Sequence, residues 1–527
     1  MNRLARKIPA RSKGRKPLAG IDVAELIKMA YALQSQGNID DARKYLDQVL
    51  RVEPGNPDAV HLISLGLLRQ LRNTAAFKFL RKWATHPNSA NASTQYYIAY
   101  SYFVVKRYRL AHQHLQRALE LEPDKVVARL LMAQVLINLD RSDDALSILR
   151  QDPVIQSAAP EDRKSYARVL ADLKQYPEAK KVLTTLLQDD IYPIDSVCDL
   201  IDLPPETWSQ ETCKQVNVLL ELPDLSVREK ALLHSAAGRI ADHEARYGEA
   251  YHHFSESKNH SARRFNYAVF RDAARVCMNN SVPETNRKPD LRPPHAGVTP
   301  LFIVGLPRSG KTLLEKLLSL RPEFAACGEV QCRTFIDADL FVGFTGEMPD
   351  QYDATLKKIK STQSKMYASE YVEGILDQYS LPKPTKFIVN TMPHNCFNIR
   401  ALYLIFPYAK FIYIRRNIKD LFIFNMMKNF KLGFGFTRNF DSFNQYYNLI
   451  EELMSHWQDR ADSSLLTIDY ADLVKSPDLT IRQVQEFLDV EPLGDTTSAP
   501  CFEEIGMSDK YIDYWKHYSE FFPPSGR

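Results

Sequence analysis

Small and hydrophobic residues recur at a fixed spacing along the first half of the chain. Two series share the same intervals of 12, 4, 3 and 5 residues: Ala30, Ala42, Leu46, Val49 and Pro54, then Ala99, Ala111, Leu115, Ala118 and Pro123. Copies lie 34 and 68 residues after the second series, at Ala133, Ala145, Ala167, Ala179, Leu183 and Leu186. A 34-residue period predicts one pair of helices per repeat, with alanines where the helices approach closely and a proline that ends the second helix.

The period weakens toward the middle of the chain. It fails between residues 193 and 226, a stretch interrupted by Pro204, Pro205 and Pro223. A degenerate late copy runs through Gly238, Ala250 and Phe254. We therefore expect helical repeats over residues 21–280.

The second half changes to a pattern of strands alternating with helices. Residues 281–298 are the expected linker, because they hold few apolar residues and the prolines 283, 289, 293 and 294. Next come an apolar run at 301–304, typical of a buried parallel strand, a loop bounded by glycines, and helical apolar spacing from 313 to 318. This order predicts an α/β domain with a parallel sheet over residues 299–527.

Composition and charge narrow the class of protein. Of the 527 residues, 45% are hydrophobic and 25% are charged, which excludes disordered, collagen-like and disulfide-scaffold classes. The formal net charge is +4, but residues 1–20 carry +7, from Arg3, Arg6, Lys7, Arg11, Lys13, Arg15 and Lys16. No apolar core region follows them. They predict a solvated flexible arm rather than a secretory signal, with contact to an anionic membrane surface or nucleic acid as the alternative.

Cysteine usage and hydropathy bear on location. The seven cysteines are odd in number and contain no C-x-x-C pair, which predicts reduced thiols, a cytoplasmic location and no zinc site. The longest apolar run, 401–414, is interrupted by Pro407 and Lys410 and is shorter than the roughly 20 residues of a membrane helix, so no span is expected. His252 and His253 are predicted to be surface or packing histidines rather than metal ligands.

The loop after the first predicted strand carries the clearest chemical signal. Residues 305–312 read Gly-Leu-Pro-Arg-Ser-Gly-Lys-Thr and match the pattern G-x-x-x-x-G-K-[ST] in its required place between a strand and a helix. Backbone N–H groups of such a loop enclose an anion together with the helix N-terminus. Arg308 and Lys311 add full positive charges. We expect phosphate binding, with a chance glycine turn as the alternative.

The sequence around this loop resembles a known family. The segment G-L-P-R-S-G-x-T-L-L-E, followed by RPEFAACGE, is similar to the 5′-phosphosulfate loop of the sulfotransferases, which use 3′-phosphoadenosine 5′-phosphosulfate (PAPS). The similarity extends through most of residues 299–490, and the repeats before it resemble tetratricopeptide repeats. The combination resembles a bacterial sulfotransferase family. It implies an N-terminal α-solenoid of tetratricopeptide-like repeats followed by a P-loop-like α/β sulfotransferase domain with a parallel sheet.

The resemblance also implies which residues bind the nucleotide. The residues expected at the 5′-phosphosulfate are Gly305, Arg308, Ser309, Gly310, Lys311 and Thr312. A predicted strand at 410–415 leads to Arg416, at the place where the family grips the 3′-phosphate. A third similar segment, 456–490, puts Tyr470 at the family's tyrosine turn, as a candidate contact for adenine.

Sulfuryl transfer requires a base for the acceptor hydroxyl and stabilisation of the charge on the leaving oxygen, without a metal. Glu329 lies in a Cys-Gly-Glu segment similar to one that supplies the base in the tyrosylprotein branch of the family. The resemblance therefore makes Glu329 the first candidate base, with a surface or helix-capping glutamate as the alternative. His394 is the second candidate, and an ordinary solvent-exposed or loop histidine is its alternative.

The chain departs from the family pattern at several places. Asn390 and Thr391 stand where the family commonly has D-K, so the usual lysine near the leaving oxygen is missing. Lys311 replaces a usual threonine or serine, and we hypothesise that its ammonium compensates from the loop. Phe424 stands where a serine often binds the 3′-phosphate and offers no hydrogen bond. After Ala499 the chain lacks much of the arginine-bearing tail of the family.

The sequence thus predicts a PAPS-dependent sulfotransferase that acts on a hydroxyl acceptor, such as protein tyrosine or glycan. The repeats are expected to bind a protein or peptide partner or the substrate, with bracing of the second domain or dimer formation as alternatives. Two other functions remain open. One is an ATP-dependent P-loop kinase, for which Asp469 is the distant candidate metal ligand. The other is a scaffold whose sulfotransferase-like domain has lost activity.

Overall fold

The computed structural model describes residues 22–70, 73–84, 86–87, 90–139, 141–150, 158–261, 265–279, 297–378, 384–428, 434–460, 464–491 and 508–523. The predicted basic arm at 1–20 and residues 281–296 of the predicted linker lie outside them. The chain divides into two compact units, residues 1–135 and 136–527. The second unit therefore contains both the later helices and the whole parallel sheet.

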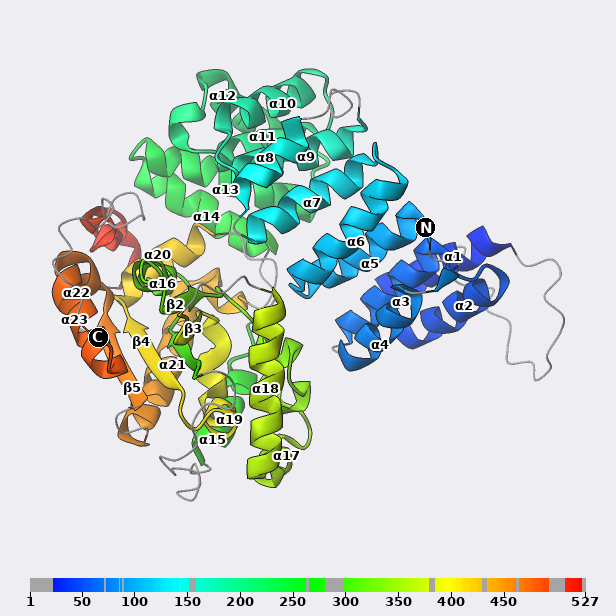
Figure 1. Ribbon diagram of the computed structural model, residues 1–527. Helices are drawn as coiled ribbons and strands as arrows, with labels where there is room; N and C mark the ends of the chain where they lie inside the picture. Colours follow the sequence, from blue (N-terminus) through cyan, green and yellow to red (C-terminus); the bar gives the residue numbers. More distant parts are fainter. Residues whose placement is uncertain are drawn as a thin grey trace. The chain divides into compact units, whose positions relative to one another are not determined.

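Fifteen α-helices precede the first strand in the described part of the chain (Figure 1). They are α1 Val23–Ser35, α2 Ile39–Val52, α3 Pro57–Arg69, α4 Asn73–Ala84, α5 Ala92–Val104, α6 Tyr108–Leu121, α7 Val126–Asn138, α8 Ser142–Arg150, α9 Pro160–Asp172, α10 Tyr176–Gln188, α11 Pro193–Asp202, α12 Gln210–Leu220, α13 Val227–His243, α14 Tyr247–Ser261 and α15 Tyr267–Asn279. The periodic alanines at 30, 42, 99, 111, 133, 145, 167 and 179 are all fully buried. The prediction of helical repeats in the first half of the chain is confirmed, and their predicted bounds of 21–280 stay a prediction.

Four helix pairs are joined by turns of one kind. Gly37, Lys106, Lys174 and Ala245 each have a positive φ, between 57° and 83°, and each lies two residues before the second helix of a pair. Only glycine adopts this conformation without steric cost. The repeat therefore conserves a backbone shape at this turn, although three of the four residues carry a Cβ atom.

The second unit contains a five-stranded sheet (Figure 1). Its strands are β1 Thr299–Val304, β2 Phe324–Ala326, β3 Phe387–Asn390, β4 Lys410–Arg415 and β5 Leu465–Asp469. They are ordered β2-β3-β1-β4-β5, and every pair is parallel. The predicted parallel sheet is confirmed. Because β1 is central, the loop that follows it opens at the carboxyl edge of the sheet, where ligands of such sheets bind.

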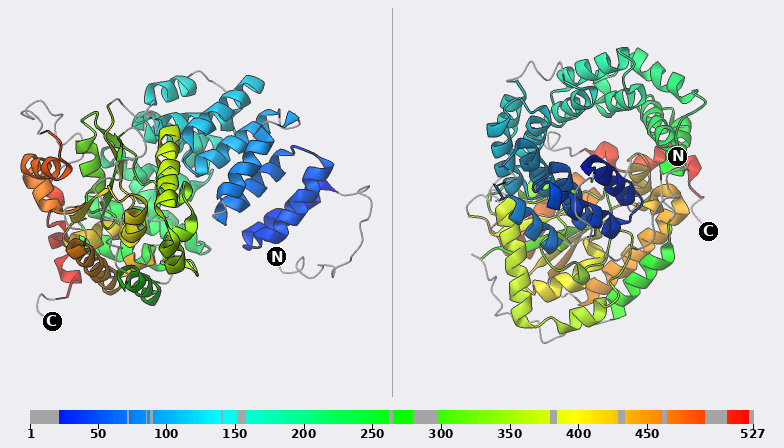
Figure 2. Two further views of the ribbon diagram at one scale, coloured as in Figure 1. Left: turned by 60° about the horizontal axis from the view of Figure 1, so that its bottom comes forward. Right: turned by 90° about the vertical axis from the view of Figure 1, so that its right-hand side faces the viewer.

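Helices cover the two faces of this sheet. Their bounds are α16 Lys311–Leu318, α17 Tyr352–Lys358, α18 Ser361–Gln378, α19 Ile399–Ile405, α20 Ile418–Met426, α21 Phe440–Arg460, α22 Tyr470–Lys475 and α23 Pro477–Leu488. The long yellow-green helix α18 lies alongside the sheet domain in both figures (Figures 1 and 2). No helix in the described parts of the chain combines the length and apolarity that crossing a bilayer requires.

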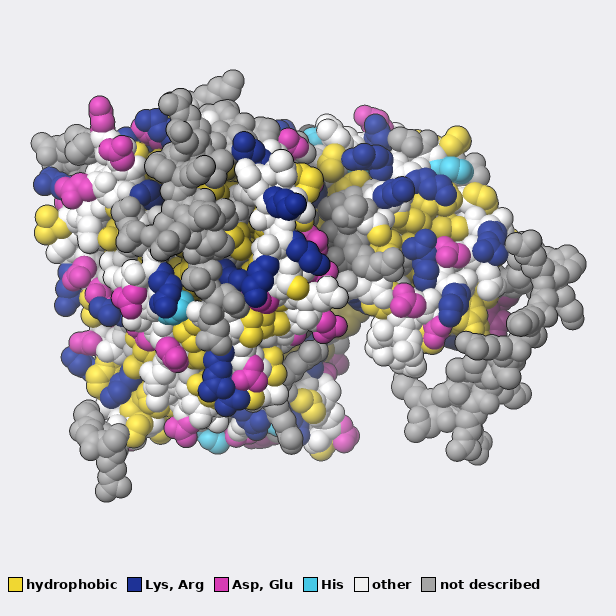
Figure 3. All heavy atoms as spheres, turned by 90° about the horizontal axis from the view of Figure 1, so that it is seen from below, with side chains coloured by type: hydrophobic (Ala, Val, Ile, Leu, Met, Phe, Trp, Pro, Cys, Tyr) yellow, Lys and Arg dark blue, Asp and Glu magenta, His cyan; other side chains and the backbone are white. Residues whose placement is uncertain are grey.

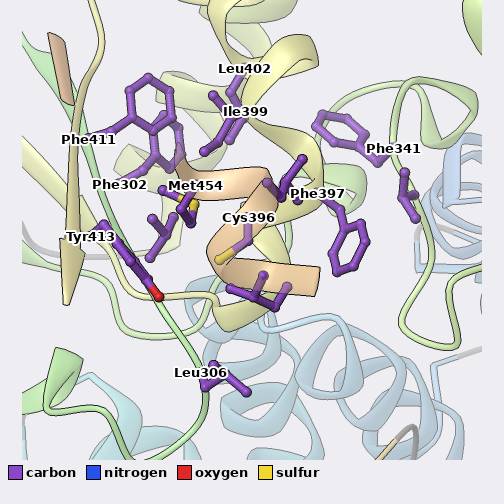
Figure 4. Packing of buried hydrophobic residues seen from close by; sticks show 14 of the residues in the cluster. Phe302, Leu306, Phe341, Cys396, Phe397, Ile399, Leu402, Phe411, Tyr413 and Met454 are labelled. Carbon is purple, nitrogen blue, oxygen red and sulfur yellow. The ribbon is translucent and has the colours of Figure 1, made fainter. Parts of the chain in front are cut away.

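Neighbouring residues of β1 point to opposite faces of the sheet, as strand geometry demands. Leu301 and Ile303 pack against apolar residues of α16 and α23. Phe302 and Val304 pack in a second cluster with α19 and α21. Figure 4 shows Phe302 beside Phe411 of β4, and their ring centroids are 5.3 Å apart. Both faces of β1 are buried, which explains why its sequence is a continuous apolar run.

The C-terminal segment joins the later helices to the sheet domain. It contains the 3₁₀ helix η12, Tyr514–Phe521. The hydroxyl groups of Tyr514 and Tyr518 both donate to Oδ1 of Asp242 on α13. The backbone N–H groups of Asp513 and Trp515 donate to the carboxylate of Asp420 on α20, each at 2.9 Å. We call residues 508–523 the C-terminal strap.

Candidate functional site

The loop at 305–312 needs glycine at both of its ends. Gly305 has a φ of 142°, and a Cβ atom there would lie 2.7 Å from the carbonyl oxygen of Ile414 on β4. Gly310 has a φ of 108°, and its Cβ would lie 2.6 Å from Cδ2 of Tyr470. The backbone thus passes close to β4 on one side and to Tyr470 on the other, which predicts that neither position tolerates a side chain.

Lys311 begins α16 and turns its side chain back into the loop. Its Nζ donates to the carbonyl oxygen of Leu306 at 2.8 Å, and the side chain is nearly fully buried. Burial lowers the pKa of Lys311 to about 8, while the Glu329 carboxylate opposes this shift. The loop therefore contains a buried lysine that titrates close to neutral pH.

Arg416 approaches the same loop from the end of β4. One guanidinium nitrogen donates to the carbonyl oxygen of Arg308 at 2.8 Å, and another donates to that of Tyr511 in the C-terminal strap at 2.6 Å. The guanidinium carbon lies 3.9 Å from the centre of the Tyr470 ring, a cation–π contact. Its Nε is buried without a hydrogen-bond partner. An anion at this place would provide the acceptor that Nε lacks.

Glu329 lies in the turn that follows β2 and is exposed. The turn is fixed from three sides. The Cys327 N–H donates to Val389 O and the Thr391 N–H donates to Gly328 O, both at 2.9 Å. The Gly328 N–H donates to Oε1 of Glu315 on α16 at 2.7 Å. The Glu329 carboxylate raises the pKa of Lys311, against the larger effect of burial, so the two predicted catalytic residues act on each other electrostatically.

His394 lies in the 3₁₀ helix η7, Pro393–Asn398, and is only 8% exposed. The solvent-exposed alternative for this histidine is therefore wrong, while its role as a base stays a prediction. Its ring packs against Phe397 and Phe344, with centroid distances of 5.0 and 5.4 Å. Burial lowers its pKa to about 4, so the imidazole is neutral at pH 7. Its Nε2 has no hydrogen-bond partner.

A small cavity of about 20 Å³ connects His394 with the start of the loop, since Gly305, Leu306 and Pro307 line it together with His394. This volume holds about one water molecule. Lys311, Arg416, Tyr470, Glu329 and His394 thus all lie around the 305–312 loop, as the sequence predicted for the nucleotide and catalytic residues. Their individual roles stay predictions.

Comparison with known proteins agrees with this geometry. Residues 300–495 match the model described as "Sulfotransferase family", and two models described as "Tetratricopeptide repeat" match residues 27–92 and 105–160. The chain carries a sulfotransferase domain behind tetratricopeptide repeats. The sulfotransferase domain contains all five strands and the 305–312 loop.

Individual relatives are distant. An uncharacterized protein of Aquifex aeolicus (strain VF5) is 21% identical over 515 residues, which cover 93% of this chain and 64% of that protein. This chain therefore spans less than two thirds of that relative. Among solved structures, the sulfotransferase domain from the curacin biosynthetic pathway is 18% identical, with 45% of this chain and 93% of that chain covered and a TM-score of 0.28. A sulfotransferase from Mycobacterium avium is 14% identical, with 63% and 98% covered and a TM-score of 0.26.

Asn425 contacts the 305–312 loop, although the sequence motifs do not predict it as a site residue. Phe424 does contact Arg416, with 4.6 Å between the guanidinium carbon and the ring centre. The next residue, Asn425, donates from Nδ2 to the carbonyl oxygen of Pro307 at 3.0 Å, and its Oδ1 is buried without a partner. The hydroxyl of Ser309 is likewise buried without a partner. Two buried polar atoms, Oγ of Ser309 in the loop and Oδ1 of Asn425 on the adjacent helix α20, therefore lack hydrogen-bond partners.

Asn390, the last residue of β3, has a structural role in the sulfotransferase domain. Asn390 donates from Nδ2 to the carbonyl oxygen of Val330 at 2.8 Å and to the hydroxyl of Tyr371 at 3.0 Å. Its Oδ1 accepts from the Met392 N–H at 3.0 Å. This network fixes the chain between β3 and η7, and with it the place of His394. Asn390 is fully buried, so it is held away from solvent.

Proposed function

We propose that the sulfotransferase domain transfers the sulfuryl group of PAPS to a hydroxyl acceptor, releasing 3′-phosphoadenosine 5′-phosphate (PAP). One observation carries the proposal. Two cationic side chains, Lys311 and Arg416, both donate to carbonyl oxygens of the 305–312 loop at the carboxyl edge of a parallel sheet. A bound nucleotide with two separate phosphate positions offers each of them an anionic partner.

The binding roles follow the atoms that lack partners. Gly305, Arg308, Ser309, Gly310, Lys311 and Thr312 hold the 5′-phosphosulfate. The free hydroxyl of Ser309 and the N–H groups at the start of α16 supply its donors. The unpartnered Nε of Arg416 serves the 3′-phosphate. Tyr470 orients Arg416 through the cation–π contact and borders the adenine.

The chemistry divides between two residues. Glu329 accepts the proton of the acceptor hydroxyl as the new S–O bond forms. The bond between sulfur and the 5′-phosphate oxygen breaks, and the ammonium of Lys311 stabilises the charge on that leaving oxygen. Lys311 thereby replaces the lysine that is missing at Thr391. His394, neutral and buried, is the second candidate base.

Calorimetry on the full chain tests the proposal with three ligands: PAP, ATP, and ATP with Mg²⁺. We expect saturable binding of PAP that requires no metal. Binding of ATP only in the presence of Mg²⁺ would support a P-loop kinase instead. Binding of neither nucleotide would support a scaffold that has lost activity, the outcome that the Thr391 and Phe424 positions motivate.

The kinase remains the second candidate because Lys311 is followed by Thr312, the lysine and hydroxyl that such enzymes use on phosphates and Mg²⁺. The residues at the ends of β3 and β5 offer little support for the metal site that a kinase would need. β3 ends in Asn390, and the carboxylate of Asp469 at the end of β5 is paired with Arg415, with both oxygens 3.1 Å from guanidinium nitrogens. A metal at Asp469 would have to displace this ion pair.

The proposal also covers the role of the tetratricopeptide repeats and the class of acceptor. We assign the tetratricopeptide repeats to binding a protein or peptide partner, or the acceptor itself, in a cytoplasmic protein. Incubation of the full chain with radiolabelled PAPS and a panel of protein, glycan and lipid acceptors identifies the substrate class. Transfer of label to one class and not to the others is the expected result.

A further inference from the structure

Two histidines and a glutamate form a cluster on helices α13 and α14, and none of the three is a residue of the proposed nucleotide site. His234 on α13 and Glu256 and His260 on α14 each offer one ligand atom, and these three atoms lie within 4.8 Å of one another. Glu256 and His260 are four residues apart on α14, so they share one helix face. Nε2 of His260 is 3.8 Å from Oε2 of Glu256.

We propose that His234, Glu256 and His260 bind one divalent transition metal ion, with Zn²⁺ as the best match. Two imidazoles and a carboxylate are donors that Zn²⁺ prefers, and three protein ligands leave a fourth position for water. Bonds of about 2.0–2.2 Å place neighbouring ligand atoms of a tetrahedral zinc about 3.3 Å apart. The ligand atoms, which lie within 4.8 Å of one another, therefore have to approach by about 1.5 Å at most.

The helix pair is built as a firm support for such a site. The Ser257 hydroxyl donates to the carbonyl oxygen of Ala231 at 2.7 Å across the pair. Gly238 of α13 lies so close to Phe254 of α14 that a Cβ atom would come within 2.6 Å of the ring. With the backbones fixed in this way, the ligands start from positions close to those they occupy around the metal, which lowers the entropic cost of binding.

His253 orients the ring of His234. Nδ1 of His234 lies 3.0 Å from Nδ1 of His253, so one ring donates to the other. When His234 is the donor, its Nε2 lone pair is free for the metal; zinc-bound histidines usually donate their second ring N–H in this way, most often to a carboxylate, a carbonyl or water.

The site is also reachable. The side chains of His260 and Glu256 are 29% and 35% exposed, which gives an ion a path from solvent. The bound metal would clamp α13 to α14, the pair that also holds Asp242 and thereby the C-terminal strap. The prediction that His252 and His253 are surface or packing histidines rather than metal ligands is compatible with this site, since neither residue is one of the three ligands.

Isothermal titration of tag-free full-length protein with Zn²⁺, after removal of metal by a chelator, tests the proposal. We expect one Zn²⁺ per chain. His234→Ala, His260→Ala and Glu256→Gln should each abolish saturable binding, and His253→Ala should weaken it by about 10–100-fold, the usual effect of losing an orienting partner. Titration with Co²⁺ should add a visible absorption typical of a tetrahedral site.

His252→Ala is the matched control, because His252 is the exposed neighbour of His253 and is not one of the three ligands. It should bind Zn²⁺ like the unmodified protein. Circular dichroism and PAP affinity report whether each variant is folded. Absence of saturable binding in the unmodified protein would overturn the proposal, and so would equal losses in His252→Ala, which indicate scattered surface histidines. Because sulfuryl transfer does not use this metal, either result leaves the proposed enzymatic function standing.

Discussion

The pKa of Lys311 gives the loop a measurable signature. Burial lowers this pKa to about 8, so the ammonium is charged below that pH and loses its charge above it. We expect the affinity for PAP, measured by calorimetry between pH 6.5 and 9.5, to fall as the pH rises through about 8. Lys311→Arg stays charged over this range and should flatten the profile. Lys311→Ala should lower turnover at least about 10²-fold, the usual loss on removing one preorganised charge stabiliser.

A near-normal rate in Lys311→Ala would remove this residue from the mechanism. An unchanged pH profile in Lys311→Arg would assign the titration to another group. Lys316 supplies a matched control, since it lies five residues further along α16 and is exposed. Lys316→Ala should leave both turnover and the pH profile unchanged.

A substitution of Glu329 should distinguish a role in sulfuryl transfer from a role in nucleotide binding. Glu329→Gln keeps the size of the side chain and removes its basicity, so we expect PAP affinity to remain within a few-fold and transfer of label from PAPS to be lost. The same substitution at Glu323, which pairs with Arg321 at 2.8 Å near the start of β2, provides a control for losing one carboxylate nearby. Loss of both affinity and transfer in Glu329→Gln would assign the residue a structural role.

The residues that the sequence predicted and those it missed differ in how far apart their contacts lie along the chain. Gly305 and Lys311 belong to one short segment, so the motif alone places them. Asn425 reaches the loop from 118 residues away, a contact that only the packed fold creates. The burial of His394 depends on Phe344 and Phe397, which pack around it in three dimensions. The sequence around His394 alone therefore did not predict that this histidine is buried.

At the scale of elements, the 34-residue period identified the helix pairs because burial repeats with them. Alanines at equivalent places, such as Ala99 and Ala167, are fully buried. The sequence did not show the turns between paired helices in the same way, because no residue type recurs at their positive-φ positions. Lys106 and Lys174 adopt the left-handed conformation that Gly37 adopts at the same place, and lysine is not a residue from which this backbone is predicted.

The late repeat offers a test of this close packing. A Cβ atom on Gly238 would lie 2.6 and 2.7 Å from two carbons of the Phe254 ring. We expect Gly238→Ala to lower the free energy of unfolding by about 1–3 kcal/mol, the usual cost of overpacking a core, despite the better helix propensity of alanine. Urea denaturation followed by circular dichroism measures the change.

Gly248 of α14 is the matched control for that substitution. A Cβ atom there would meet only a side-chain oxygen of Glu520, at 3.8 Å, an ordinary contact. Gly248→Ala should therefore be neutral or slightly stabilising. If Gly238→Ala is equally stable, the Phe254 ring moves aside, and α13 and α14 are held less firmly than the metal site requires.

At the scale of the whole molecule, the distribution of surface charge and the contacts of the C-terminal strap are considered in turn. Basic and acidic side chains are interspersed on the face seen in Figure 3, in keeping with a net charge of only +4. The tail after Ala499 lacks much of the arginine-bearing segment that covers the nucleotide in the family, although Trp515 and Lys516 resemble the end of that segment. The C-terminal strap nevertheless supplies a contact to Arg416 through the carbonyl oxygen of Tyr511.

The C-terminal strap links Arg416, at the 305–312 loop, with helix α13, and removal of the Asp242 carboxylate would break this link. Tyr514 and Tyr518 both donate to its carboxylate, while Tyr511, in the same strap, holds Arg416. A hydrogen bond to a charged group contributes about 1.5–3 kcal/mol. We therefore expect Asp242→Ala to loosen the strap and weaken PAP binding roughly 10-fold or more, as measured by calorimetry on the full chain.

The control for this change is Asp202 on α11, whose largely exposed carboxylate pairs with Arg239 of α13. Asp202→Ala removes an acid that contacts the same helix and should leave PAP affinity unchanged, because exposed ion pairs contribute little. Phe substituted for both Tyr514 and Tyr518 should reproduce the effect of Asp242→Ala. Unchanged affinity in both of these variants would mean that Arg416 is held by the loop alone, and that the repeats and the nucleotide site act independently.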